Sequence, residues 1–280
     1  MNPTYLPRIQ ALCPDLAIET VVLNTDGLAN EVVIINETLV FRFTTGEYSR
    51  RALAGEVSVL TLIRPHITLP MPDPFHVSDD LMAYSLLPGA ALTRQVWEAL
   101  DEQDQQVVAD QLATFLRQLH ATPGDATIPT TVAPCRYADQ AGIYARVKEK
   151  VYPLLLKHQI AWAEALYASV LDDPTIFDYT PQLIHGDLAC YHILFDPTTR
   201  RLAGIIDFGV AGLGDPALDL GCLYQYYGAG FVNRLYDAYP TARTFAKRTQ
   251  FYAQAGELAW VLQGLESGEP FWFTAHIGAA

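Results

Sequence analysis

Basic residues are scarce in this sequence. Its 18 Lys and Arg residues stand against 31 Asp and Glu residues in a chain of 280, and the formal net charge at pH 7 is −13. Nucleic acids and anionic membranes are bound by positively charged surfaces, so this balance argues against both as partners. It favours a cationic small molecule. The acidic residues are not concentrated near the C-terminus, where acids and bases almost balance.

Closely spaced cysteines and long apolar runs are also missing. The four cysteines, Cys13, Cys135, Cys190 and Cys222, lie far apart without a C-x-x-C pair, which argues against a zinc site and a disulfide framework. No apolar run reaches the roughly 18 residues of a membrane span, and the first residues lack the basic and then apolar pattern of a signal peptide. We therefore expect a soluble, cytoplasmic monomer.

Two common nucleotide-binding motifs are absent or misplaced. No Gly-Lys pair occurs, so the chain has no Walker A loop. Residues 212–217 match G-x-G-x-x-A, but they come late in the chain and no βαβ array precedes them. We therefore expect no dinucleotide-binding fold, and any nucleotide must be held in another way.

Two aspartates are present in a pattern that suits phosphoryl transfer. Asp187 follows the apolar stretch before His185 and precedes a predicted strand at 193–195, and Asp207 comes near the end of a second strand, 201–208. A hairpin with a turn at 196–199 would present both carboxylates at one edge. One carboxylate can then deprotonate an attacking hydroxyl, while the other holds the metal that bridges the nucleotide phosphates.

Residues 183–222 resemble the aminoglycoside phosphotransferase family, whose fold is similar to that of protein kinases. The resemblance extends over nearly the whole chain, but its specific motifs lie in this segment. It implies that Asp187 is the catalytic base and Asp207 the principal Mg²⁺ ligand. Most members have asparagine five residues after the base, where this chain has His192. The aminoglycoside 2''-phosphotransferases are similar in having histidine there, and the macrolide phosphotransferases come next.

His192 leaves two interpretations open. Mg²⁺ prefers oxygen ligands and imidazole suits softer metals, yet a neutral ring nitrogen can still coordinate; otherwise the ring only hydrogen-bonds the loop. We expect coordination. The resemblance gives structural roles to His185, which would hold the catalytic loop, and to Asp219, which would brace that loop from the following helix.

The first third of the chain predicts three short antiparallel strands, at residues 20–23, 31–35 and 38–43. The turn between the first two contains one glycine, Gly27, and ends at Asn30. Its small residues would let a nucleotide phosphate approach the backbone closely.

Arg42 and Glu56 form a predicted ion pair. Arg42 lies on the strand face opposite Phe41 and Phe43, and the resemblance places it where kinases have their phosphate-contacting lysine. Arginine can clamp a phosphate and also pair with a carboxylate. Glu56 lies on a helix indicated by apolar residues at 53, 57 and 60. The alternative is that both are ordinary surface residues.

Prolines at 65, 70, 72 and 74 precede a predicted strand at 81–87. The resemblance makes this segment the last strand of the small lobe and the hinge. A purine would contact the backbone around Ser85, Leu86 and Leu87. Tyr84, at the entrance, would restrict which purine can bind. ATP and GTP both remain open as the phosphate donor.

The rest of the chain predicts mainly helices, at 94–120, 144–171, 232–239 and 249–264. In the first, Val108, Leu112, Phe115, Leu116 and Leu119 form a core stripe. The C-terminal segments would cover one wall of the acceptor cleft, where Glu257, Glu266 and Glu269 are candidates for binding substrate amines.

Together these features predict an α+β, protein-kinase-like bilobal fold with a small antiparallel-sheet lobe and a mainly helical lobe. Residues 1–88 would be the nucleotide-binding lobe with the hinge, and residues 89–280 the catalytic and acceptor-binding lobe. The resemblance implies an antibiotic kinase that uses Mg²⁺ and transfers the γ-phosphate of ATP or GTP to an aminoglycoside hydroxyl.

Three alternatives stay open. The acceptor could be a macrolide, or a metabolite such as an amino alcohol or a sugar. The chain could also be a catalytically silent nucleotide-binding protein, because Arg42 and His192 depart from the commonest pattern. The presence of both Asp187 and Asp207 argues against a catalytically silent protein.

Overall fold

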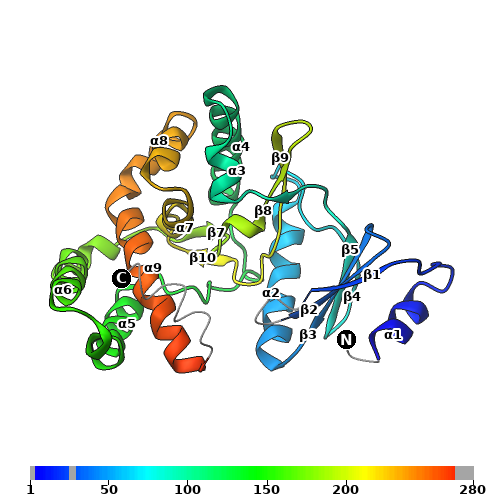
Figure 1. The fold of residues 1–280 in the computed structure, drawn as a ribbon, viewed down its shortest axis with the longest axis horizontal. Coiled ribbons are helices and arrows are strands. Elements are labelled where there is room, and N and C mark those ends of the chain that lie inside the picture. The colour runs from blue at the N-terminus through cyan, green and yellow to red at the C-terminus, as the bar shows by residue number, and fades with distance from the viewer. Residues whose placement is uncertain (1–3, 25–29, 269–280) are drawn as a thin grey trace.

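The computed structural model describes residues 4–24 and 30–268 as two adjoining parts (Figure 1). An antiparallel sheet with two helices lies on the right of the view, and a mainly helical part lies on the left. This confirms the predicted α+β class. Within the described residues, no helix has both the length and the apolar character needed to cross a membrane. Gly27 and Glu269 lie outside the described residues.

Most strands lie between Val21 and Ala91 or between Gln182 and Gly214, and the rest of the described chain is mainly helical. The α-helices are α1 (Tyr5–Leu12), α2 (Glu47–Ile63), α3 (Arg94–Glu98), α4 (Glu102–Ala121), α5 (Tyr137–Lys150), α6 (Lys157–Leu171), α7 (Ala217–Tyr227), α8 (Ala229–Ala238) and α9 (Ala246–Ser267). The strands are β1 (Val21–Asn24), β2 (Asn30–Ile35), β3 (Leu39–Thr44), β4 (Pro74–Val77), β5 (Leu81–Ser85), β6 (Ala90–Ala91), β7 (Gln182–Ile184), β8 (Ile193–Asp196), β9 (Arg201–Ile205) and β10 (Gly212–Gly214). Short 3₁₀ helices cover Tyr152–Leu154, Pro174–Phe177, Cys190–His192 and Pro240–Phe245.

The N-terminal sheet has the strand order β1-β2-β3-β5-β4, with every neighbouring pair antiparallel. The tight turn between β2 and β3 places Asn36 and Glu37 at φ 51° and 53°, a region that asparagine tolerates well. The Asn36 side chain accepts hydrogen bonds from the backbone N–H groups of Glu19 and Thr20. The predicted meander is therefore confirmed.

The two faces of β3 have different partners. Phe41 and Phe43 pack beneath α1, where the ring of Tyr5 stacks on Phe43 at 3.9 Å between centroids. Arg42 lies on the opposite face, toward Glu56 of α2. The alternation read from the sequence is confirmed, whereas α1 itself was not predicted.

Prolines explain two differences from the predicted elements. The helix predicted over 144–171 is wrong as a single element, because Pro153 starts a 3₁₀ turn that separates α5 from α6. A strand that was not predicted, β4, begins at Pro74 within the proline-rich stretch. The proline is tolerated there because β4 lies at the edge of the sheet. The helix predicted over 94–120 is interrupted at Asp101, whose side chain caps α4.

The predicted stripe on α4 is fully buried, from Val108 to Leu119. It belongs to one continuous apolar cluster that also includes residues of α2, β5, α7 and α8. A second cluster joins α5, α6 and α9. The segment from β7 to β9 runs through the first cluster, so both predicted aspartates are mounted on well-packed elements.

Candidate active site

The loop after β7 is held by one buried carboxylate. Asp219, on α7, accepts the backbone N–H groups of His185 at 3.0 Å and Gly186 at 2.8 Å. Its third partner is Nε2 of the buried His120, at 3.1 Å. Burial would raise the pKa of the Asp219 carboxyl, but the hydrogen bonds from His120 and from the backbone of His185 together help to hold that pKa below its ordinary value. The charged form of Asp219 therefore anchors the loop.

Gly186 allows the loop to turn in a crowded place. Its φ is +81°, and a Cβ there would lie 3.1 Å from the carbonyl oxygen of Val210 and 3.2 Å from the hydroxyl of Thr131. That hydroxyl donates to the same carbonyl at 2.6 Å. Thr131 thus joins the catalytic loop to the segment after Asp207, a link that no sequence pattern indicated.

His185 packs inside the loop. Its Nδ1 accepts the N–H of Asp187 at 3.3 Å, and its Nε2 lies 3.1 Å from the carbonyl oxygen of Ile206. Because a carbonyl only accepts, Nε2 bears the proton. Burial lowers the pKa of His185, which keeps the ring neutral. The ring therefore links Asp187 to the chain just before Asp207.

The Asp187 carboxylate lies at the surface of this loop. Its side chain is 41% exposed. Burial of the surrounding loop raises the pKa of this carboxyl. A carboxylate with a raised pKa is a better proton acceptor than an ordinary aspartate.

His192 presents one nitrogen to the second aspartate. Its Nδ1 lies 2.8 Å from the carbonyl oxygen of Asp187 and so donates to it. In the neutral ring, Nε2 then has a lone pair, and it lies 3.5 Å from Oδ2 of Asp207. Two acceptor atoms that face each other at this distance are suited to sharing a cation.

Asp207 lies just beyond β9, in the left-handed region at φ 64°. Such a backbone costs energy for most residues and is often found at functional sites. Partial burial would raise the pKa of its carboxyl, but neighbouring groups that include Arg42 hold that pKa below its ordinary value. Asp207 is therefore charged, and its side chain is 44% exposed.

Arg42 connects the sheet to Asp207. Its guanidinium pairs with the fully buried Glu56 of α2, and its Nη1 lies 3.7 Å from Oδ1 of Asp207. Glu56 also accepts the backbone N–H of Phe208 at 3.2 Å. Among the described residues, Arg42 Nε is buried without a hydrogen-bond partner. The structure thus brings together Arg42, Glu56 and Asp207.

The donor set fits Mg²⁺ bound together with phosphates. No group of three or more His, Cys, Asp or Glu side chains that could hold a metal occurs in the described part of the chain. His192 Nε2 and Asp207 Oδ2 offer two ligands. Mg²⁺ in phosphoryl-transfer sites commonly takes one or two protein ligands and completes its shell with phosphates and water.

The predicted hinge offers a purine fewer free groups than the sequence indicated. Tyr84 is 7% exposed and packs in the main core. The N–H of Leu86 already donates to the carbonyl oxygen of Thr38 at 2.7 Å. A purine at this hinge would therefore use other backbone groups of the segment around Ser85 and Leu87. Asn30 begins β2, and the rest of the predicted phosphate turn lies in the undescribed residues 25–29.

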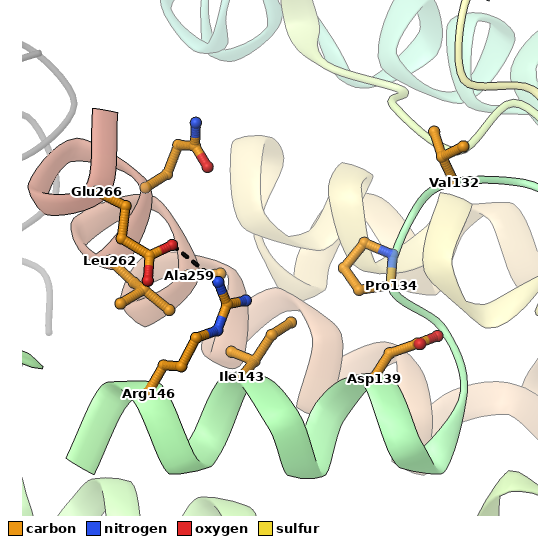
Figure 2. Close-up of a pocket in the computed structure, with 9 residues that line it drawn as sticks. Val132, Pro134, Asp139, Ile143, Arg146, Ala259, Leu262 and Glu266 are labelled. Carbon is orange, nitrogen blue, oxygen red and sulfur yellow. Dashed lines mark hydrogen bonds and ion pairs between the residues drawn. The ribbon is translucent and has the colours of Figure 1, made fainter. Parts of the chain in front are cut away.

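The predicted acceptor carboxylates are engaged within the protein. Glu266 pairs with Arg146 and Lys150, each at 2.8 Å. It lines a cavity of about 360 Å³ between α5 and α9, together with Val132, Pro134, Asp139, Ile143, Arg146, Ala259, Leu262 and Gln263. Figure 2 shows the Arg146–Glu266 pair across this cavity, which neither catalytic aspartate lines. Glu257 accepts a hydrogen bond from Gln225 at 2.7 Å.

The G-x-G-x-x-A match has a packing explanation. β10 pairs with β7, and a Cβ at Gly212 would lie 2.5 Å from the carbonyl oxygen of Pro129. At Gly214 it would lie 2.7 Å from Ile184. Both glycines therefore let neighbouring chain segments approach, in agreement with the expectation of no dinucleotide-binding fold.

Three comparisons agree with this geometry. A family model described as the phosphotransferase enzyme family matches residues 20–254. The viomycin phosphotransferase of Streptomyces vinaceus is 29% identical over 157 residues, which cover 55% of this chain and only about half, 53%, of that protein. The aminoglycoside 3'-phosphotransferase of Streptomyces fradiae is 25% identical over 225 residues, which cover 74% of this chain and 79% of that protein.

A solved structure matches almost the whole chain. The GDP complex of the wild-type aminoglycoside 2'-phosphotransferase-IIIa has a TM-score of 0.89 and 25% sequence identity, and the match covers 99% of this chain and 97% of that one. This likeness confirms the predicted bilobal fold.

Proposed function

Because the chain belongs to the phosphotransferase enzyme family, we propose that it transfers the γ-phosphate of a purine nucleoside triphosphate to a hydroxyl of an aminoglycoside. The observation that carries the proposal is the grouping of Asp187, His192, Asp207 and Arg42 in one site, where the two carboxylates are partly exposed. In this proposal residues 1–88 hold the nucleotide, and the helical part from residue 89 onward holds the acceptor.

Asp187 is the catalytic base in this proposal. Its carboxylate accepts the proton of the attacking hydroxyl as the new O–P bond forms and the bond between the β- and γ-phosphates breaks. The raised pKa of Asp187 makes it a better acceptor for that proton. His185 and Asp219 support this role indirectly, because they fix the loop that positions the carboxylate.

Arg42, His192 and Asp207 bind the donor in this proposal. The guanidinium of Arg42, held by Glu56, contacts the phosphates. His192 and Asp207 would hold Mg²⁺, which neutralises phosphate charge when bound. Asp207 keeps its charge, because neighbouring groups that include Arg42 hold its pKa below the ordinary value.

A substrate screen tests the proposed function. Purified protein would be assayed with ATP and with GTP against aminoglycosides, macrolides and amino alcohols, with mass spectrometry of the products. We expect phosphorylated aminoglycoside. Phosphorylation of macrolides alone would replace the acceptor in the proposal, and nucleotide binding without transfer to any acceptor would refute it.

Salt should weaken acceptor binding more than donor binding. Aminoglycosides bear several positive charges, and the protein has a net charge of −13, so screening over a Debye length of about 8 Å at physiological ionic strength should raise the acceptor KM. We expect a clear rise in that KM between low and high salt, with a smaller change for the nucleotide in saturating Mg²⁺. Steady-state kinetics with each substrate varied in turn would measure both. An acceptor KM that does not respond to salt would contradict a polycationic acceptor.

Replacing His192 should change the Mg²⁺ requirement. In His192→Ala the lone pair that faces Asp207 is lost, so half-maximal activity should need roughly 10–100 times more Mg²⁺. His192→Asn supplies an oxygen ligand and should stay close to the wild type. Turnover against Mg²⁺ concentration, at saturating nucleotide, measures the shift. Equal requirements in the wild type and His192→Ala would leave His192 with only its hydrogen bond to the loop.

A further inference from the structure

An exposed tyrosine stands beside the catalytic loop. Tyr191 lies in the 3₁₀ helix just after the Asp187 loop and is 43% exposed. Its ring is nevertheless fixed in place. It meets the ring of His192 nearly at a right angle, 85°, with 4.6 Å between centroids. An aromatic ring that is both exposed and held in one orientation is prepared to contact a ligand.

A second tyrosine completes the arrangement. Tyr226, on α7, contacts Tyr191 edge to face, with 6.0 Å between centroids and an interplanar angle of 81°. Their hydroxyl oxygens lie 3.4 Å apart. An ordinary tyrosine has a pKa of about 10, so both phenols are neutral at pH 7. His192, whose ring Tyr191 covers, donates through Nδ1 to the carbonyl oxygen of Asp187 at 2.8 Å, which ties the tyrosines to the Asp187 loop. We call Tyr191 and Tyr226 the tyrosine wall.

The tyrosine wall comes from the helical part of the molecule. α7 packs beside α8 and α9, on the left in Figure 1, whereas Arg42 and Glu56 come from the sheet and α2 on the right. The turn of α7 that bears Tyr226 also bears Gln225, which hydrogen-bonds Glu257 of α9. The wall therefore belongs to the part of the chain proposed to hold the acceptor, and Tyr191 covers the ring of His192 there, while Arg42 comes from the sheet.

We propose that the tyrosine wall positions the acceptor by stacking against an amino-sugar ring, so that the reacting hydroxyl lies at Asp187. This inference rests on the proposed function. The C–H groups of a sugar pack well on an aromatic face, and an ammonium group on the ring adds a cation–π attraction. A neutral phenol near a carboxylate suits such a cation, since it adds no charge of its own to the site.

The test compares ring removal with hydroxyl removal. Tyr191→Ala should raise the KM of an aminoglycoside about 10-fold, the size expected for a desolvated cation–π contact. The nucleotide KM and the Mg²⁺ requirement should stay unchanged. Tyr191→Phe keeps the ring and should restore the acceptor KM to within about 2-fold. Tyr226→Ala should act like Tyr191→Ala, and calorimetry with an aminoglycoside and the nucleotide-bound enzyme should show the same losses.

One control variant and the pattern of losses distinguish the possible failures. Tyr48, 60% exposed on α2, is not part of the site, and Tyr48→Ala should behave as wild type. If the wild type phosphorylates aminoglycosides but Tyr191→Ala keeps the wild-type acceptor KM, the stacking role of the tyrosine wall is refuted while the proposed function stands. An equal rise in acceptor KM and Mg²⁺ requirement would also refute it, since Tyr191 would then act only by supporting His192. Absence of any transfer in the wild type would instead refute the proposed function.

Discussion

Asp187→Asn should lose most of its turnover while it binds the nucleotide as the wild type does. The carboxamide keeps the shape of the side chain but cannot accept the proton of the attacking hydroxyl. General-base assistance contributes about 10²–10⁴-fold, and the raised pKa of Asp187 in this loop makes it a stronger base than an ordinary aspartate. Single-turnover kinetics with preformed nucleotide complex would measure the loss directly.

The nucleotide side of the site provides the control for Asp187→Asn. Arg42 and Asp207 do not depend on the Asp187 side chain for their ion pair, so titration with a nucleotide in Mg²⁺ should give the wild-type dissociation constant. Wild-type turnover in Asp187→Asn would remove Asp187 from the mechanism. A joint loss of turnover and nucleotide affinity would point instead to a disturbed loop.

Local patterns were sufficient to predict the parts of the site that lie close together in sequence. Asp187, His192 and Asp207 fall on one loop and one hairpin, so their order along the chain already places them near one another. The alternation of β3 was likewise enough to put Arg42 on the face opposite Phe41. Period-two patterns set the face of a side chain without reference to the rest of the fold.

Contacts between distant segments could not be predicted in this way. His120 meets Asp219 across 99 residues, and Thr131 meets Val210 across 79. His120 lies in the last turn of α4 and Thr131 lies in an irregular stretch, so no local sequence pattern indicates the contacts of either residue. Tyr191 and Tyr226 were likewise missed, because an aromatic residue in an apolar segment reads as core until its exposure is known.

The prediction that Glu266 binds substrate amines gained no support, for a physical reason. Glu266 was selected for its charge alone, yet in the fold it lies between Arg146 and Lys150. The positive charges of these two side chains, both on α5, compensate the negative charge of Glu266. Charge in a sequence therefore indicates a binding residue only when its spatial neighbours are known.

Asp219→Ala should destabilise the whole protein, by about 3–5 kcal/mol, because it leaves buried partners of a charged group unpaired. The backbone N–H groups of His185 and Gly186 and the ring of His120 would all lose their acceptor. Urea unfolding followed by circular dichroism measures the change. Asp79→Ala, at an exposed position in the turn before β5, is the matched control and should stay within about 0.5 kcal/mol of the wild type.

The contribution of Asp219 should also depend on pH with a definite sign. Its pKa is lower in the folded protein than its ordinary value, so its stabilisation is fully present above the unfolded-state pKa of about 3.9 and is lost as pH falls through the folded-state value. The stability difference between the wild type and Asp219→Asn should therefore be constant near neutrality and shrink below about pH 4. A difference that grows on acidification would show that Asp219 is protonated in the folded protein, and the catalytic loop would then need another anchor.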